Sequence, residues 1–418
     1  MALKKKPVTG MKDILPSEME IRDYVIRLIK ETYGSFGFSS IEAPCVEHLS
    51  NLNSKQGGEN EKLIFKILKR GNKLKINEAE SESDLTEEGL RYDLTVPLSR
   101  YYSNHANELS SPFKALQMGN VWRADRPQRG RFRQFMQCDI DILGEPSNLA
   151  EIELILATTT LLGKLDFRDF TIRINERRIL KAMAEYSGFD KDTFDTVFIT
   201  LDKMDKIGLA GVAEELKKEG FDKDAVSRYM KLFQNVTGDT SGIIFIKDTL
   251  GDFLDQDVVD SLTTIIETVD RLKSVDFKIV FDPTLVRGMS YYTGTIFEIS
   301  MEEFGGSVGG GGRYDEMIAK FTGNKVPACG FSIGFERIVM LLLEREFKIP
   351  DASMKKAYLI EKNMPSARVA DILAKAADER KSGLSVQVSM MKKNKKFQKE
   401  QLKSEGYHEI CEFFTDRM

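Results

Sequence analysis

Arginines and carboxylates stand close together in the segment 121–144, which reads VWRADRPQRGRFRQFMQCDIDILG. Its first half is an arginine-rich turn, and arginine presents a planar fork of donors that fits phosphate oxygens two at a time. Its second half alternates polar and apolar residues, so Gln137, Asp139 and Asp141 lie on one face of a strand. The segment can therefore hold a polyanion at one end and a cationic or NH-donating small molecule at the other. The alternative is an exposed basic turn followed by an ordinary half-buried edge strand.

A second pair of candidate ligand-binding residues lies in the segment 90–97, LRYDLTVP. Asp93 and Thr95 are two residues apart, which places a carboxylate and a hydroxyl on one face of a strand. Together these groups can bind an ammonium group. The alternative is that they cap the end of a strand.

The segment 285–294, LVRGMSYYTG, sets one arginine beside two tyrosines and two flexible glycines. Arg287 can approach an anion, and the hydroxyls of Tyr291 and Tyr292 can hydrogen-bond a polar ligand. A loop around a stacked core tyrosine is the alternative interpretation.

A glycine run and a strand–helix junction follow. The segment 305–315 reads GGSVGGGGRYD, and consecutive glycines let the backbone approach a ligand closely or take positive φ. A flexible hairpin is the alternative. The segment 328–342, ACGFSIGFERIVMLL, predicts a strand that enters a helix, with Arg337 in the first turns of that helix.

Hydrophobic periodicity predicts the elements that must position these residues. A long helix is expected over 17–36, followed by a strand over 38–46 that Pro44 interrupts, and a hairpin over 63–76. Further along, we expect helices at 149–163 and 176–188, strands at 170–174, 277–281 and 295–300, and a helix-rich stretch over about 190–274. After a linker, strands at 357–360 and 384–388 alternate with a helix at 366–381.

The composition describes a globular chain of more than one domain. Its 418 residues are 41% hydrophobic and 30% charged, which predicts two or three domains with a large core. The formal net charge is −4, so any binding of nucleic acid must depend on local basic patches. We expect no secretory signal and no membrane span, because no segment is apolar enough for either.

The cysteines and histidines exclude several kinds of chemistry. The cysteines are widely spaced, which argues against a zinc site or a disulfide framework and favours reduced thiols in a cytoplasm. They are Cys45, Cys138, Cys329 and Cys411. The three histidines form no HExxH motif, so metalloprotease and Ser-His-Asp chemistry have no support. We therefore predict no metal site in the protein itself.

Taken together, these motifs resemble those of class II aminoacyl-tRNA synthetases, in the form that histidyl-tRNA synthetases carry. The segment 121–144 resembles motif 2, the helix and strand over 17–46 resemble motif 1, and 328–342 resembles motif 3. LRYDLT and RGMSYYTG resemble the two histidyl signatures. One departure is Ser290, where many family members have an acidic residue, and it concerns how Arg287 is oriented.

The resemblance implies an α+β fold: a class II antiparallel sheet flanked by helices, with a helical insertion and a small α/β carboxyl-terminal domain. The expected boundaries are a catalytic domain over 1–345 with the insertion at about 190–274, a linker over 346–355, and a shortened anticodon-binding-like domain over 356–418. The lysine-rich stretch 392–399 suits contacts with phosphates, although a solvated helix face is the alternative.

The activity that the resemblance implies is histidine–tRNA ligation, in which ATP activates L-histidine to histidyl-adenylate before transfer to histidine tRNA. The implied catalytic residues are Arg123 and Arg287. The implied histidine-binding residues are Asp93, Thr95, Arg123, Gln137, Asp141, Arg287, Tyr291 and Tyr292, and the implied ATP-binding residues are Arg123, Arg131 and Arg337. Mg²⁺ bound with ATP, the absence of zinc, a homodimer and a cytoplasmic location are implied as well.

A second function class remains open at this point. Relatives of these synthetases that have lost catalysis serve as activators of ATP phosphoribosyltransferase or as sensors of uncharged tRNA. Both typically lack part of the histidine or ATP motifs, whereas the implied arginines and acids are all present here. The short carboxyl-terminal domain and Ser290 are the features that favour the regulator.

Overall fold

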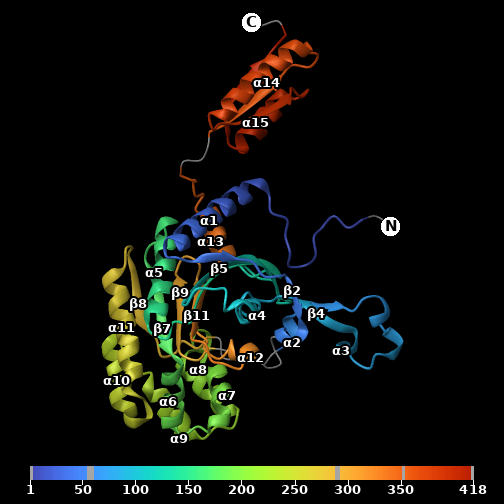
Figure 1. The fold of residues 1–418 in the computed structure, drawn as a ribbon. Helices are drawn as coiled ribbons and strands as arrows, with labels where there is room; N and C mark the ends of the chain where they lie inside the picture. Colours follow the sequence, from blue (N-terminus) through green and yellow to red (C-terminus); the bar gives the residue numbers. More distant parts are fainter. Residues whose placement is uncertain (1–2, 54–60, 288–291, 351–353, 416–418) are drawn as a thin grey trace. The chain divides into compact units, whose positions relative to one another are not determined.

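The structure is a computed structural model that describes residues 3–53, 61–287, 292–350 and 354–415 (Figure 1). It divides into two compact units. The first contains Met1–Ile14 and Arg22–Arg345, and the second contains Leu15–Ile21 and Glu346–Met418. The fold is α+β, as the family resemblance implies.

An eight-stranded mixed sheet forms the centre of the first unit, in the order β1-β5-β6-β11-β10-β9-β7-β8. The six strands from β5 to β7 are paired antiparallel, whereas β1 and β8 join the two edges in parallel. In this order the strands are Ser39–Ile41, Phe113–Trp122, Gln134–Leu143, Ala328–Ile333, Gly306–Arg313, Thr295–Met301, Phe170–Glu176 and Phe277–Phe281. The predicted antiparallel sheet is therefore confirmed, with parallel pairing added at both edges.

Helices pack on the sheet because its strands carry apolar residues toward them. On β6, Cys138, Ile140 and Ile142 are fully buried, and α5 and α13 pack against this strand. The main helices are α1 Pro16–Ser35, α4 Thr95–His105, α5 Leu149–Lys164 and α13 Phe335–Glu344. The residues between those on β6 point to the opposite face, so one strand supplies both the core and the polar surface.

The connection between the neighbouring strands β7 and β8 is helical. It contains α6 Arg177–Ser187, α7 Phe194–Leu201, α8 Met204–Lys218, α9 Lys223–Leu232, α10 Thr240–Leu250 and α11 Gln256–Leu272. In Figure 1, α10 and α11 lie beside β8, and α11 also packs against α5. Two hydrogen bonds tie α11 to the start of α5: Asn148 Nδ2 donates to the Ser261 carbonyl at 3.2 Å, and Ser261 Oγ donates to Asn148 Oδ1 at 2.6 Å.

Two local predictions are wrong. The strand expected over 38–46 is split into β1 and β2 Val46–His48, which belong to different sheets, because proline interrupts the ladder. The hairpin expected over 63–76 does not form. Instead β3 Lys66–Leu68 pairs with the later strand β4 Thr86–Leu90 in a three-stranded sheet of order β2-β4-β3.

The second unit is a three-layer α/β structure. Its strands β12 Lys355–Ile360, β13 Ser385–Met390 and β14 Tyr407–Phe413 form a parallel sheet of order β13-β12-β14. Alternate residues of β12 face different helices. Tyr358 packs with Ile372 of α14 Ser366–Lys381, whereas Leu359 packs with Leu402 of α15 Lys395–Ser404. Local alternation thus predicts the layering of this unit.

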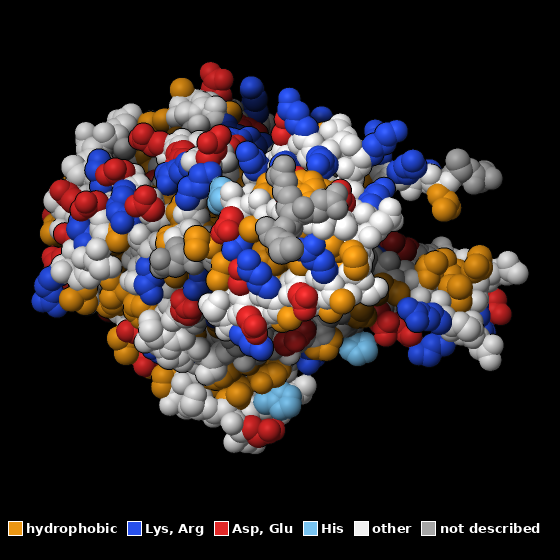
Figure 2. Space-filling view, turned by 90° about the horizontal axis from the view of Figure 1, so that it is seen from above, with side chains coloured by type: hydrophobic (Ala, Val, Ile, Leu, Met, Phe, Trp, Pro, Cys, Tyr) orange, Lys and Arg blue, Asp and Glu red, His pale blue; other side chains and the backbone are white. Residues whose placement is uncertain are grey.

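Charge on the surface matches the near-neutral composition. Positive and negative side chains are interspersed over the face that Figure 2 shows, and the formal net charge is −4. None of the helices in the described part of the chain is long and apolar enough to cross a membrane.

A buried ion pair fixes α1 to α13. Arg22 donates to both carboxylate oxygens of Glu336, at 2.6 and 2.9 Å, and the two side chains are 7% and 9% exposed. The Arg22 guanidinium also lies 4.8 Å from the centre of the Phe335 ring. Because Glu336 accepts the Met136 amide as well, this carboxylate joins α13 to the start of β6.

Replacing Arg22 by methionine should lower the free energy of unfolding by about 3–5 kcal/mol, because the substitution leaves a buried carboxylate without its cation. Thermal or urea unfolding measures the effect. The control is Arg27→Met on the same helix, where the ion pair with Glu31 is more than half exposed and should contribute at most about 1 kcal/mol. Equal losses in the two variants would show that burial of the Arg22 pair has no energetic importance.

Candidate active site

A pocket of about 490 Å³ lies against the polar face of the central sheet. Its floor comes from β6, β10 and β11, and its walls come from the starts of α4 and α13 and from the chain between β5 and β6. The volume falls in the range of small-molecule sites. The site residues expected from the sequence that line it are Asp93, Thr95, Arg123, Arg131, Gln137, Asp141, Arg287, Tyr292 and Arg337.

The polar row on β6 lies on the pocket floor. Gln137, Asp139 and Asp141 are at most 9% exposed, and all three line the pocket. This confirms the face that the alternation predicts. It also means that several carboxylates are buried together with few counter-charges, which raises their pKa values.

Asp141 is held by a residue that the sequence analysis did not assign to the ligand. The Tyr314 hydroxyl donates to Asp141 Oδ1 at 2.5 Å, and both side chains are buried. Burial raises the pKa of Asp141 to about 7, with a smaller contribution from the negative charge of Asp93, while the Tyr314 hydrogen bond acts in the opposite direction. A Cβ at Gly330 would lie 2.0 Å from Asp141 Oδ1, so only glycine leaves room for this carboxylate.

Gln137 and Asp139 form a second polar group beside Asp141. The Gln137 amide donates to Ser332 Oγ at 3.2 Å and to Asp139 Oδ2 at 3.4 Å, and Ser332 donates to Asp139 Oδ1. Burial and the neighbouring charge of Asp141 raise the pKa of Asp139 well above its usual value. The Gln137 Oε1 atom is buried and has no hydrogen-bond partner within the described chain. A donor from a ligand would satisfy it.

Asp93 and Thr95 line the pocket from the start of a helix and not from a strand. The prediction of a strand is wrong, because Thr95 is the first residue of α4 and Asp93 precedes that helix. Asp93 Oδ1 accepts the Val96 amide at 3.2 Å, as an acid at a helix amino terminus does. Burial raises the pKa of Asp93, and the Val96 amide and the charge of Arg123 offset part of that increase.

Arg123 lies between the acids and the other arginines. Its Nε donates to the Tyr92 carbonyl at 2.8 Å, and its guanidinium lies 5.2 Å from the centre of the Phe135 ring. Its positive charge lowers the pKa of Asp139 on one side and also the pKa of Arg337 on the other. The pocket therefore passes from an acidic region to a basic one across this side chain.

The basic region brings together arginines from three distant segments. All four arginines line the pocket; burial lowers the pKa of Arg337, and the charges of Arg287, Arg131 and Arg123 lower it further. Arg287 Nη2 donates to Ser307 Oγ at 2.6 Å, and Arg337 Nη1 donates to the carbonyl of the same serine at 2.5 Å. An anion with several oxygens would relieve this concentration of positive charge.

Tyr292 packs against the hydrophobic cluster that contains Tyr314, and it also lines the pocket. The other tyrosine of the predicted pair, Tyr291, and the departing residue Ser290 lie outside the described residues.

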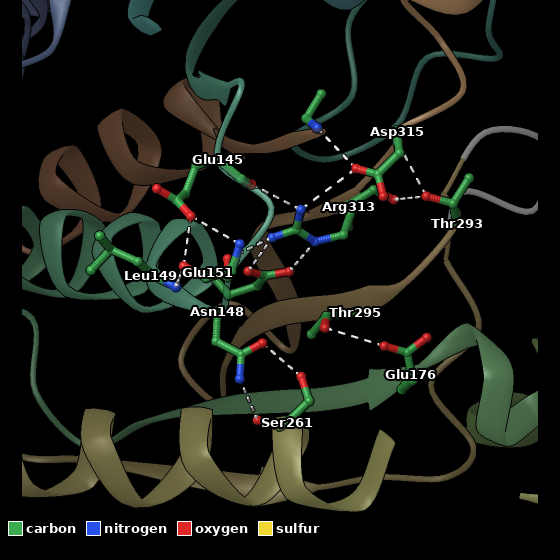
Figure 3. Close-up of polar contacts among 12 residues, drawn as sticks. Glu145, Asn148, Leu149, Glu151, Glu176, Ser261, Thr293, Thr295, Arg313 and Asp315 are labelled. Atoms are coloured by element: carbon green, nitrogen blue, oxygen red, sulfur yellow. Dashed lines mark hydrogen bonds and ion pairs between the residues drawn. The ribbon is translucent and has the colours of Figure 1, made fainter. Parts of the chain in front are cut away.

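The residues that the sequence analysis missed lie on β9, β10 and β11 or directly after β10. They are Tyr314, Ser332, Ser307 and Glu298. Ser307 and Tyr314 lie within the glycine-rich segment 305–315 and Ser332 within 328–342, so these two motifs were a signal, whereas Glu298 had none. The neighbour of Tyr314, Arg313, is structural: it donates to both oxygens of the buried Glu151 at 2.7 Å, within the network that Figure 3 shows.

The raised pKa of Asp141 predicts a pH-dependent stability. From pH 5 to about 7 the folded state keeps a proton on Asp141 that the unfolded state has lost, so the wild-type protein loses about 2–3 kcal/mol of stability. Asp141→Asn cannot ionise. We therefore subtract the melting temperature of the wild type from that of the variant. This difference should be more positive at pH 8 than at pH 5. Asp260→Asn, an exposed acid on α11, is the control, and equal behaviour of the two variants would contradict the prediction.

Comparisons with known proteins address the family. A family model described as histidyl-tRNA synthetase matches residues 10–338. A curated histidine–tRNA ligase of Leifsonia xyli is 42% identical, over 95% of this chain and 92% of that one, and one of Christiangramia forsetii is 38% identical, over 82% and 78%.

Solved structures agree with this result. A histidyl-tRNA synthetase of Nostoc is 28% identical with a TM-score of 0.78, over 97% of this chain and 90% of that one. An ATP phosphoribosyltransferase regulatory subunit/histidyl-tRNA synthetase of Bacillus halodurans has the same TM-score over 99% of both chains, but its 20% identity concerns the fold alone. From the matched family model and the identity to curated relatives, we conclude that the chain belongs to the histidyl-tRNA synthetase family.

Proposed function

We propose that the protein is a histidine–tRNA ligase, which converts L-histidine and ATP to histidyl-adenylate and then transfers the histidyl group to the 3′ end of histidine tRNA. One observation carries the proposal: buried carboxylates and clustered arginines share a single pocket and meet at Arg123. Acids suit an ammonium group and an imidazole, whereas guanidinium groups suit a triphosphate. The reacting carboxylate of histidine and the α-phosphate of ATP would then meet near Arg123.

Histidine is assigned to the acidic region. Asp93, Thr95 and Gln137 bind its amino group, and the buried Gln137 Oε1 supports this role because it needs a donor. Asp141 and Tyr292 bind the two imidazole nitrogens, with Tyr314 fixing the orientation of Asp141. Tyr291 is assigned to the imidazole as well. A pocket that hydrogen-bonds both nitrogens rejects apolar analogues by about 10⁴-fold, because its buried polar groups would be left without partners.

ATP is assigned to the basic region. Arg123 and Arg287 hold the α-phosphate and the histidine carboxylate, and Arg131 and Arg337 hold the outer phosphates. The histidine carboxylate oxygen attacks the α-phosphorus and pyrophosphate leaves, so no protein nucleophile is needed. The arginines contribute position and charge, which is what phosphoryl transfer requires. Mg²⁺ bound with ATP would offset part of the negative charge of its phosphates, and the proposal assigns no role to zinc.

The remaining parts are assigned to tRNA. In the second step the terminal ribose hydroxyl attacks the acyl carbon of the adenylate. Residues 1–345 form the catalytic domain, and the helical segment 190–274 contacts the acceptor arm. Residues 346–355 are a linker, and 356–418 form a shortened anticodon-binding-like domain. Its exposed lysines suit phosphate contacts; they are Lys392, Lys393, Lys395 and Lys396. The working form is a cytoplasmic homodimer.

The regulatory alternative is less well supported. A subunit that has lost catalysis has no need to keep four arginines in one pocket with three buried carboxylates. Clustered positive charges lower the stability of the folded protein when the site is empty. They stabilise the negative charge that develops in the transition state of a reaction.

Charging of histidine tRNA tests the proposal directly. The purified protein should attach labelled histidine to intact histidine tRNA in the presence of ATP and Mg²⁺. A protein that binds histidine but neither exchanges pyrophosphate nor charges tRNA would be the regulator instead. An acceptor minihelix assayed beside the intact tRNA measures what the second unit contributes, because the minihelix lacks the anticodon.

Arg287→Ala should reduce histidine-dependent ATP–pyrophosphate exchange by about 10²-fold or more, since one charge at the phosphoryl centre is lost. The matched control is Arg168→Ala, which removes a partly exposed arginine outside the pocket and should exchange at the wild-type rate. Near-normal exchange by Arg287→Ala would remove Arg287 from the mechanism.

A further inference from the structure

Arg287 is fixed on the pocket wall by two neighbouring strands. Its Nε donates to Glu298 Oε2 on β9, and its Nη2 donates to Ser307 Oγ on β10 at 2.6 Å. The guanidinium lies against Gly310, where a Cβ would be 2.6 Å from Nη1. These contacts leave the side chain little freedom to turn away from the pocket.

Glu298 is fixed in turn by Arg173 of β7. It is 8% exposed, and its Oε1 lies 3.6 Å from Arg173 Nη1. Arg173 is held by two more acids: its Nε donates to Asp282 Oδ2 at 2.5 Å, and its Nη1 donates to Asp205 Oδ2 at 2.9 Å. Asp205 lies at the start of α8, so this chain of ion pairs extends from the helical connection to Arg287.

Glu298 contacts Arg287 from behind the substrate pocket. A second cavity of about 320 Å³ is lined by Arg173, Asp205 and Glu298, whereas Arg287 lines both cavities. Glu298 therefore does not face the space assigned to histidine and ATP, and its side chain contacts the wall of the substrate pocket through Arg287.

The charge of Glu298 also has a function in the empty site. The neighbouring arginines lower the pKa of Arg337, and the Glu298 carboxylate acts in the opposite direction. A carboxylate behind Arg287 thus reduces the repulsion among the arginines before an anion is present. It allows Arg287 to remain in place without substrate, and pre-organised charge is what lowers a barrier.

We propose that Glu298 is a positioning residue for Arg287 and that Arg173 holds Glu298 in place. The inference rests on the proposed function, because it assigns the consequence to the adenylation step. Glu298→Gln keeps the shape of the side chain but loses the negative charge that pairs with Arg287 and Arg173. Its kcat for ATP–pyrophosphate exchange should fall about 10-fold or more, while the KM for ATP changes much less, because misplaced charge affects the transition state most.

The matched control is Glu303→Gln. Glu303 lies beyond the end of the same strand and pairs with the exposed Arg345 outside both cavities, so its loss should leave kcat unchanged. Circular dichroism and the melting temperature show whether either variant is folded. Wild-type kcat in a folded Glu298→Gln variant would overturn the proposal.

A second background tests whether Glu298 acts through Arg287. Arg287→Lys keeps a positive charge but has no Nε–H for Glu298 to accept. Adding Glu298→Gln to this variant should cost less than about twofold in kcat, compared with about 10-fold in the wild-type background. An equal cost in both backgrounds would show that Glu298 acts independently of Arg287. Absence of exchange in the wild-type protein would instead contradict the proposed function and not this inference.

Discussion

Charges of both signs are concentrated in one small space, and the rest of the first unit is arranged to keep them there. Three buried carboxylates and four guanidinium groups line the same pocket. Burial raises the pKa values of Asp139 and Asp141 and lowers the pKa of Arg337, and neighbouring like charges shift all three further in the same directions. Only side chains that are fixed by strong partners remain in such an arrangement.

Those partners come from β10, from β11 and from Tyr314, which directly follows β10. Tyr314 holds Asp141, Ser332 holds Asp139, and the backbone of β10 holds Arg337 through the Ser307 carbonyl. The strands that supply them are adjacent in the sheet, where neighbouring strands are about 4.8 Å apart. A rigid sheet therefore sets the distances between groups that are far apart in sequence.

Glycine is required where these charged groups press against the sheet. A Cβ at Gly330 would overlap the Asp141 carboxylate, and one at Gly310 would overlap the Arg287 guanidinium. The glycine run is thus a strand within the central sheet, and its missing side chains leave space for side chains from other elements. The flexible hairpin considered as an alternative does not form. The same side chains would be displaced by several tenths of an ångström or more if alanine stood in either position.

The sequence by itself determined which residues of a strand share a face. Alternation placed Gln137, Asp139 and Asp141 together because side-chain direction in a strand depends only on local geometry. The strand over 277–281 and the helix over 366–381 followed from the same local periodicity, and the structure has both with these bounds.

Only the tertiary structure decided which partners those residues have. Tyr314 reaches Asp141 across 173 positions of the chain, through the pairing of β6 with β11 and of β11 with β10. Thr95 begins a helix although its neighbours alternate like a strand, and β3 pairs with β4, which lies later in the chain. Periodicity contains no information about strand order or register, which depend on how the whole sheet buries its apolar face.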